Sequence, residues 1–240
     1  MERRVFFNSV IGIPLLMPVG NVSELFSVVL PRKILDNREF SGIDPIIPFR
    51  FYQNREEYML KQVIELNKSF GYKKFLITAP MDDIRLKGFP DKSTYGEIGE
   101  LILRIKRNLS NTDIQIGWWC APSIRIGHGP YQPITGIDGS TPDMAPCPLD
   151  KDFCEFFSSN IAEVVSIAHP FMVQIEDDFN LSNQGPVKFG CFCPLHLQEF
   201  SERQNRYYSR EDLMNIFSET NSESIRLRRE WAKLSRDSLA

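Results

Sequence analysis

The chain has 240 residues, and its 42% of hydrophobic and 25% of charged residues are ordinary for a soluble globular protein. Its formal net charge of −3 at pH 7 favours neither nucleic acid nor anionic lipid as a partner. No apolar run is long enough to span a bilayer, and the N-terminal apolar run is soon interrupted by Asn8 and Ser9, which makes a poor signal peptide. We therefore expect a cytoplasmic protein in which residues 1–240 form a single domain, with no nucleic acid and no membrane as partner.

Short apolar runs alternate with amphipathic stretches along the chain. The runs predict four strands, over residues 5–13, 74–80, 113–120 and 171–175. The amphipathic stretches predict five helices, over about 54–70, 93–105, 150–168 and 195–203, and from about 222 onward. We expect Gly71 to end the first helix, Ser93 or Thr94 to cap the second, and Asp150 to cap the third. A long segment dotted with prolines separates the first strand from the first helix, and we expect it to be a loop.

Repetition of strand and helix predicts a parallel sheet covered by helices, which is either an open doubly wound sheet or a (β/α) barrel. No Gly-x-Gly-x-x-Gly turn and no phosphate loop follows the first predicted strand, which argues against an open nucleotide-binding sheet. The fold class that we expect is therefore α/β, a parallel (β/α) barrel of the TIM type. A closed barrel needs eight strand–helix units and we find about four, so we expect a partial barrel completed by a second copy of the chain or by a missing C-terminal half.

The fourth predicted strand ends in three adjacent acids, Glu176, Asp177 and Asp178. Side chains alternate along a strand, so Glu176 and Asp178 point one way and Asp177 the other. Repulsion among three carboxylates raises at least one pKa, which suits a general acid that protonates a leaving glycosidic oxygen. A solvated loop or a cation site is the alternative. We take all three as catalytic candidates because perturbed carboxylates in clefts are enriched at functional sites.

The chain has five cysteines, which are Cys120, Cys147, Cys154, Cys191 and Cys193. Their odd number and uneven spacing do not predict a disulfide framework. Cys191, Cys193 and His196 supply three soft ligands close together, whereas tetrahedral zinc needs four. Cys147 follows the third predicted strand, on the same side of the sheet as the loop after the fourth, and neighbouring loops can bring it within reach. Two buried cysteines beside a surface histidine are the alternative.

Aromatic and polar side chains follow the other predicted strands. Trp118 and Trp119 end the third strand, and aromatic faces stack on the apolar faces of sugar rings. Neighbours on a strand face opposite ways, so one of the two rings is expected in the core. Arg125 in the next loop and Asp83 at the end of the second strand are candidates for binding hydroxyls, or they pair with other side chains. These four residues are our expected contacts to a carbohydrate substrate.

The segment from Cys147 to Phe200 resembles the family 42 glycoside hydrolases, the zinc-containing β-galactosidases. In that family a Cys-Pro pair follows the third strand, the fourth strand ends in Asn-Glu-Tyr, and a loop with Cys-aromatic-Cys-x-x-Cys leads into a helix that carries a Phe. The corresponding pieces here are Cys147-Pro148, Asp177-Asp178-Phe179 and Cys191-Phe192-Cys193-x-x-His196. Their order and spacing agree over roughly sixty residues.

The resemblance implies a structural zinc held by Cys147, Cys191, Cys193 and His196. It also matches Asp178 to the acid/base of the family, which is a Glu after an Asn, and it places the nucleophile in the second half of the barrel. A retaining mechanism needs both carboxylates about 5 Å apart, so we do not expect this chain to complete the reaction by itself. The resulting hypothesis is an O-glycoside hydrolase or the N-terminal fragment of one. The alternatives are a non-catalytic carbohydrate-binding or interaction remnant of such a barrel, and a metal-dependent hydrolase that uses the acids as ligands.

Overall fold

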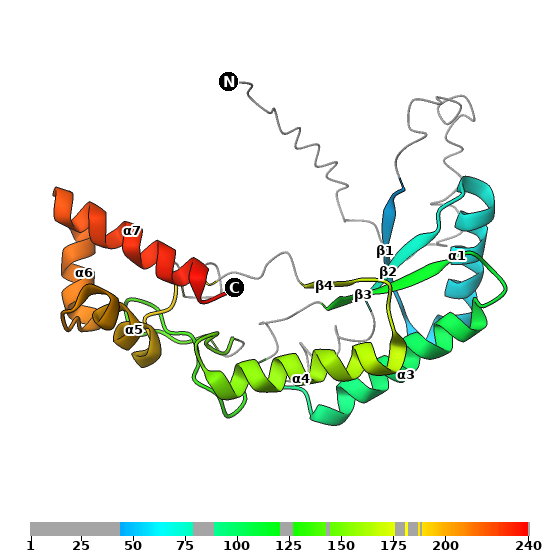
Figure 1. The fold of residues 1–240 in the computed structure, drawn as a ribbon, viewed down its shortest axis with the longest axis horizontal. Helices are drawn as coiled ribbons and strands as arrows, with labels where there is room; N and C mark the ends of the chain where they lie inside the picture. Colours follow the sequence, from blue (N-terminus) through cyan, green and yellow to red (C-terminus); the bar gives the residue numbers. More distant parts are fainter. Residues whose placement is uncertain are drawn as a thin grey trace, which may run out of the picture. The chain divides into compact units, whose positions relative to one another are not determined.

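The computed structural model describes the residues 44–78, 89–120, 127–142, 145–175, 181, 187 and 189–239. The predicted first strand, 5–13, lies outside them. The described residues form a mixed α/β structure with a four-stranded, all-parallel sheet and six α-helices (Figure 1). None of the helices in these ranges is long and apolar enough to cross a membrane.

The sheet is built from β1 (Ile46–Arg50), β2 (Lys74–Thr78), β3 (Gln115–Cys120) and β4 (Val173–Ile175). Its spatial order is β1-β2-β3-β4, so each described strand lies beside the strand that follows it in the chain. The order does not reverse within this part of the sheet, and every pairing is parallel. The alternation of strands and helices along the sequence therefore predicted the parallel sheet correctly.

Strand β1 was not predicted, because Pro48 lies in its middle and proline cannot donate a hydrogen bond to a neighbouring strand. The described part of the sheet explains how the proline is tolerated. There β1 pairs with β2 alone, and an edge strand accommodates a proline whose nitrogen faces away from its neighbour.

Three helices follow the first three described strands: α1 (Glu56–Phe70), α3 (Lys92–Asn108) and α4 (Lys151–Ala168), with a short 3-10 turn, η4 (Gln53–Arg55), before α1. Gly71 ends α1 with a left-handed φ of 73°, as its position in the sequence predicted. Asp150 caps α4 by accepting hydrogen bonds from the backbone N–H groups of Asp152 and Phe153. Helix α3 begins one or two residues before the expected caps, with Asp91 at its N-cap.

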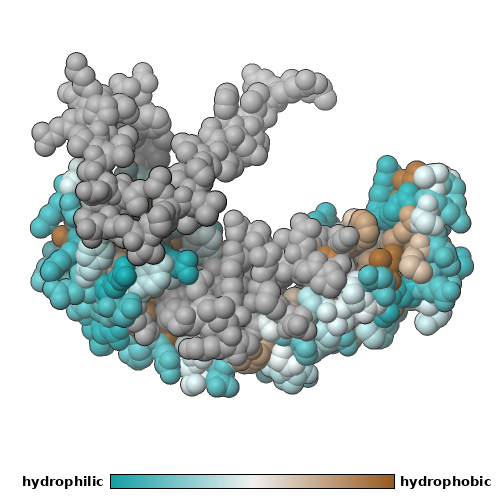
Figure 2. All heavy atoms as spheres, turned by 180° about the vertical axis from the view of Figure 1, so that it is seen from behind, coloured by the Kyte–Doolittle hydropathy of each residue, from teal (hydrophilic) through white to brown (hydrophobic). Residues whose placement is uncertain are grey.

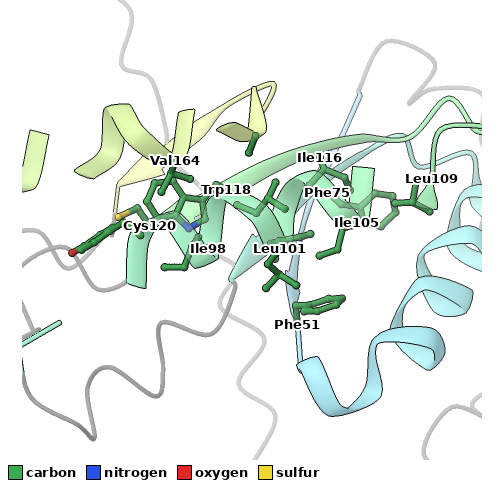
Figure 3. Close-up of a cluster of buried hydrophobic side chains, with 14 of the residues drawn as sticks. Phe51, Phe75, Ile98, Leu101, Ile105, Leu109, Ile116, Trp118, Cys120 and Val164 are labelled. Carbon is green, nitrogen blue, oxygen red and sulfur yellow. The ribbon is translucent and has the colours of Figure 1, made fainter. Parts of the chain in front are cut away.

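The main core lies between the sheet and these three helices. Alternate strand residues point into it, among them Phe75 and Ile77 of β2 and Ile116 and Trp118 of β3. The close-up view shows Phe75, Ile116 and Trp118 beside residues of α3 and α4 (Figure 3). Because α1, α3 and α4 all contribute buried residues to this one cluster, they cover the same face of the described sheet.

The C-terminal helices α5 (Pro194–Gln204), α6 (Arg210–Ser218) and α7 (Ser222–Asp237) share a second core. At its centre the ring of Trp231 stacks on Phe192, with centroids 4.2 Å apart, and meets Phe200 edge to face. Helix α6 was missed by the sequence analysis, although a capping box marks its start: Ser209 and Asp212 each accept from the other's backbone N–H.

Candidate metal centre

Cys147 lies in the turn that leads from an antiparallel bridge into helix α4. The bridge joins Pro133 to Pro146, and the backbone N–H of Cys147 donates to the carbonyl of Gln132 at 2.6 Å. The carbonyl of Cys147 then accepts from the N–H of Asp150, the residue that caps α4. The backbone at Cys147 is thus held on both sides, which fixes the direction of its side chain.

The other three candidate ligands surround the start of helix α5. Cys193 is the N-cap residue, Pro194 occupies the first helical position, and His196 is the third residue of the helix. Side chains at the N-cap and the third position of a helix meet, as they do in a capping box, so this spacing alone brings Cys193 and His196 together. Cys191 precedes them, and between the two cysteines the N–H of Phe192 donates to the carbonyl of Thr135 at 2.6 Å. That bond joins the cysteine loop to the segment that leads to Cys147.

These elements bring the four side chains into one cluster. The ligand atoms of Cys147, Cys191, Cys193 and His196 all lie within 4.8 Å of one another. The Sγ atom of Cys147 is 3.2 Å from Nδ1 of His196 and 3.5 Å from Sγ of Cys193, and Sγ of Cys193 is 3.6 Å from the same Nδ1. All four residues are fully buried.

The separations match those around a tetrahedral metal ion. Zinc binds Cys sulfur at about 2.3 Å and His nitrogen at about 2.0 Å, which puts two sulfurs about 3.8 Å apart and a sulfur and a nitrogen about 3.5 Å apart. The distances that involve Cys147, Cys193 and His196 fall close to both values. The arrangement can therefore hold a metal ion without large movement of its side chains, and three thiolates with one imidazole are ligands typical of zinc.

The orientation of the imidazole also suits a metal ligand. Nε2 of His196 lies 3.2 Å from Oγ of Ser238, and the hydroxyl of Ser238 donates to the carbonyl of Ser235 at 2.9 Å. Because that donation uses the hydroxyl proton, the oxygen accepts from Nε2–H. Nδ1 is then unprotonated and faces the sulfurs, and such an outer hydrogen bond is typical of metal-bound histidine.

The buried thiols have strongly displaced pKa values. Hydrogen bonds with Cys191 and Cys193, together with burial, raise the pKa of Cys147, and burial raises the pKa of Cys191 to about 12. Hydrogen bonds from Cys147, Cys191 and the backbone N–H of His196 lower the pKa of Cys193. A bound dication would favour the charged form of all three, because metal ligation deprotonates thiols.

Burial decides what this centre can do chemically. Its surroundings are apolar, with Ile134, Ala145, Leu181 and Val187 in the same buried cluster. Four protein ligands complete a tetrahedron, so no coordination position remains for a substrate or a water. The geometry fits a metal that joins distant segments of the chain, and it does not fit a catalytic metal. All five cysteines are free thiols in the structure.

The remaining predicted site residues fall into two groups. Glu176, Asp177, Asp178, Arg125 and Asp83 lie outside the described residues. Of the two candidate sugar platforms, Trp118 is fully buried in the main core, so neither face of its ring is left for a sugar. Trp119 is half-buried and points to the opposite face of the strand, where its register partner is Gln174. The expectation that one of the two rings belongs to the core is confirmed.

Ser238 was not found by the sequence analysis. It lies 42 residues after His196 and follows helix α7, and nothing in the sequence pairs it with the histidine. Only the packing of α7 against α5 brings the two side chains together.

Comparisons with known proteins give no relative: no family model, no curated protein and no solved structure matches the chain.

Proposed function

We propose that the chain is a glycoside-hydrolase-type (β/α) barrel segment in which a structural zinc joins the loops that follow β3 and β4. The buried Cys147, Cys191, Cys193 and His196 cluster carries this proposal. Its four members are the residues that the resemblance to family 42 implied, and two of them lie almost fifty residues apart in sequence.

The arrangement of the sheet supports a barrel over an open doubly wound sheet. A doubly wound sheet reverses its strand order at a switch point and carries helices on both faces. The described strands run in sequential order, and α1, α3 and α4 pack on one face of them. In a (β/α) barrel the other face points to the barrel interior, and the active site lies beyond the carboxyl ends of the strands.

The same argument assigns roles to the side chains. Trp119 lies on the face away from the helices, next to the carboxyl end of β3, and its indole N–H is buried with no hydrogen-bond partner among the described residues. Gln174 of β4 shares that face, and strand alternation predicts that Glu176 and Asp178 follow it there. In this proposal Asp178 or Glu176 is the general acid that protonates the leaving oxygen, and Trp119 stacks on the sugar.

Hydrolysis of a panel of nitrophenyl glycosides by the zinc-loaded chain tests the proposal. If the chain hydrolyses any of them without the nucleophile of the second half-barrel, Asp178→Asn should lower kcat/KM by about 100- to 10,000-fold where Asp178 is the general acid. Glu176→Gln and Asp177→Asn identify which of the three acids acts, and Asp152→Asn, on the exposed side of α4, is the matched control. Activity that survives loss of all three strand-end acids would overturn the assignment.

Binding without hydrolysis would support the second hypothesis, a carbohydrate-binding remnant of the barrel. In that case Trp119→Ala should weaken sugar binding, and Trp119→Phe, which keeps an aromatic face, should retain most of it.

A further inference from the structure

A pocket of about 580 Å³ opens among helices α6 and α7 and the residues just before the cysteine loop. Its lining is mostly apolar and includes Phe189, Met214, Phe217 and Trp231. Phe189 is 69% exposed and Met214 45%, so two large apolar side chains of the lining are accessible from outside. Hydrophobic surface is visible among the C-terminal helices in the space-filling view (Figure 2). The volume lies in the range of pockets that bind small organic molecules.

Among the described residues that line the pocket, Arg228 is the one charged side chain and none is acidic. Nη1 of Arg228 donates to the carbonyls of Phe217 and Glu219 at the end of helix α6, at 2.8 and 2.6 Å. Both acceptors are backbone oxygens, and within the described ranges the guanidinium forms no ion pair with a carboxylate. The pocket therefore carries a positive charge whose other N–H groups can bind an anionic group.

Two buried donors lie at the other end of the lining. Nε1 of Trp231 and Oγ of Ser235 are buried and have no hydrogen-bond partner among the described residues. A Cβ atom placed on Gly190 would be 2.8 Å from Oγ of Ser235 and 3.5 Å from Nε1 of Trp231. Gly190 therefore lies directly against both donors, and a side chain at this position would collide with Ser235. Trp231 and Ser235 also line the pocket, so a ligand oxygen that reaches this end of it would accept from both, which would remove the free-energy cost of leaving them unpaired.

The spacing along α7 determines the kind of ligand. Arg228, Trp231 and Ser235 lie three and four residues apart, so they share one face of the helix. At 1.5 Å per residue, Arg228 and Ser235 are separated by about 10 Å along the helix axis. We propose that this pocket binds a small aromatic carboxylate, with its carboxylate on Arg228 and a second oxygen on the hydrogen-bond donors Trp231 and Ser235. This site is separate from the proposed sugar site and does not depend on it.

The pocket is connected to the metal centre. Gly190 directly precedes Cys191, and the carbonyl of Ser235 accepts from Ser238, whose oxygen faces His196. Removal of the metal should therefore loosen both the Gly190 side and the Ser235 side of the pocket. We expect the zinc-loaded chain to bind the carboxylate more tightly than the chelator-treated chain does.

Calorimetric titration of the zinc-loaded chain with three probes tests the proposal. The probes are p-hydroxyphenylpropionate, phenylpropionate, which lacks the far oxygen, and p-hydroxyphenylpropionamide, which lacks the charge. We expect the first to bind most tightly, with roughly fivefold weaker binding of phenylpropionate and roughly tenfold weaker binding of the amide. Binding of the first probe should also shift the indole N–H resonance of Trp231, which a Trp231→Phe variant identifies.

Variants of α7 provide the controls. Arg228→Gln should lower the affinity for p-hydroxyphenylpropionate to the affinity for the amide, and it should leave the affinity for the amide unchanged. Arg229→Gln, at the next and exposed position, should change neither affinity. Because Arg228 also binds carbonyls of α6, Ala232→Trp serves as a second variant: it fills the pocket from an exposed position and should abolish binding. Thermal melts establish that each variant is folded.

Three results would overturn the proposal: no binding of any probe, equal binding of acid and amide, or binding that survives Ala232→Trp. A fall in solution mass caused by Ala232→Trp would instead identify the pocket as an interface between two copies of the chain. A chain that binds the carboxylate and hydrolyses no glycoside leaves this inference standing while it removes catalysis from the proposed function.

Discussion

Replacing Cys147 with serine should destabilise the chain only when metal is present. Cys147 and Cys193 lie 46 residues apart, so a metal bound by both holds together segments that are distant in the unfolded chain. When the free metal concentration is about 1,000 times the Kd for the folded chain, binding raises the free energy of unfolding by about 4 kcal/mol. For a chain of this size that corresponds to a rise of about 8–16 °C in Tm. Cys147→Ser removes one of the four ligands and should therefore lose most of the stabilisation that the metal provides.

Melting curves by circular dichroism, with zinc and with excess chelator, measure this effect. Serine is close in shape to cysteine, so we expect the wild type and Cys147→Ser to melt within a few degrees of each other in chelator. Cys154→Ser is the matched control, because that exposed thiol donates only to the carbonyl of Pro148 and lies outside the cluster. A wild-type Tm that does not respond to chelator, or a Cys147→Ser Tm that falls equally with and without zinc, would refute the reasoning.

Three further predictions follow from single contacts. Ser238→Ala should weaken zinc binding about 10- to 100-fold, because it removes the hydrogen bond to Nε2 of His196. Competition with a zinc indicator measures the affinity, and an effect no larger than that of Ser166→Ala on α4 would contradict the prediction. Tyr95→Phe should leave the free energy of unfolding unchanged or raise it by about 1 kcal/mol, because the buried hydroxyl of Tyr95 has no partner among the described residues. A fall of more than about 1 kcal/mol in the free energy of unfolding, measured by denaturant titration, would contradict this prediction. The hydrogen bonds of Ser209 lower the pKa of Asp212. The stability that this pair contributes is therefore present above the ordinary pKa of an aspartate and is lost as pH falls through the lowered pKa. The difference in Tm between wild type and Ser209→Ala should narrow in acid, and a difference that stays constant with pH would contradict the assignment.

The sequence predicted most of the sheet and the ends of several helices, because those features depend on local chemistry. Buried strands read as apolar runs, Gly71 takes the left-handed conformation that ends α1, and Asp150 caps α4. Strand β1 was missed because Pro48 masks it, and only pairing with β2 explains its presence. Helix α6 was missed although Ser209 and Asp212 form a capping box at its start.

The candidate site shows the same division between local and distant contacts. Cys193 and His196 were recognisable because they lie three residues apart in the sequence, and the structure places them at the N-cap and at the third residue of α5. The addition of Cys147 depended on the order of the sheet, since parallel strands bring the loops that follow neighbouring strands to one end. The contact of His196 with Ser238, and the pocket beside Trp231, depend on how α7 packs, which no pattern in the sequence specifies.

X-ray absorption at the zinc edge of the purified chain tests the central claim most directly. The structure predicts one metal ion per chain with three sulfur neighbours at about 2.3 Å and one nitrogen neighbour at about 2.0 Å. A chain purified and titrated with zinc that binds no ion, or that binds it only through oxygen, would contradict the claim that Cys147, Cys191, Cys193 and His196 form a metal centre.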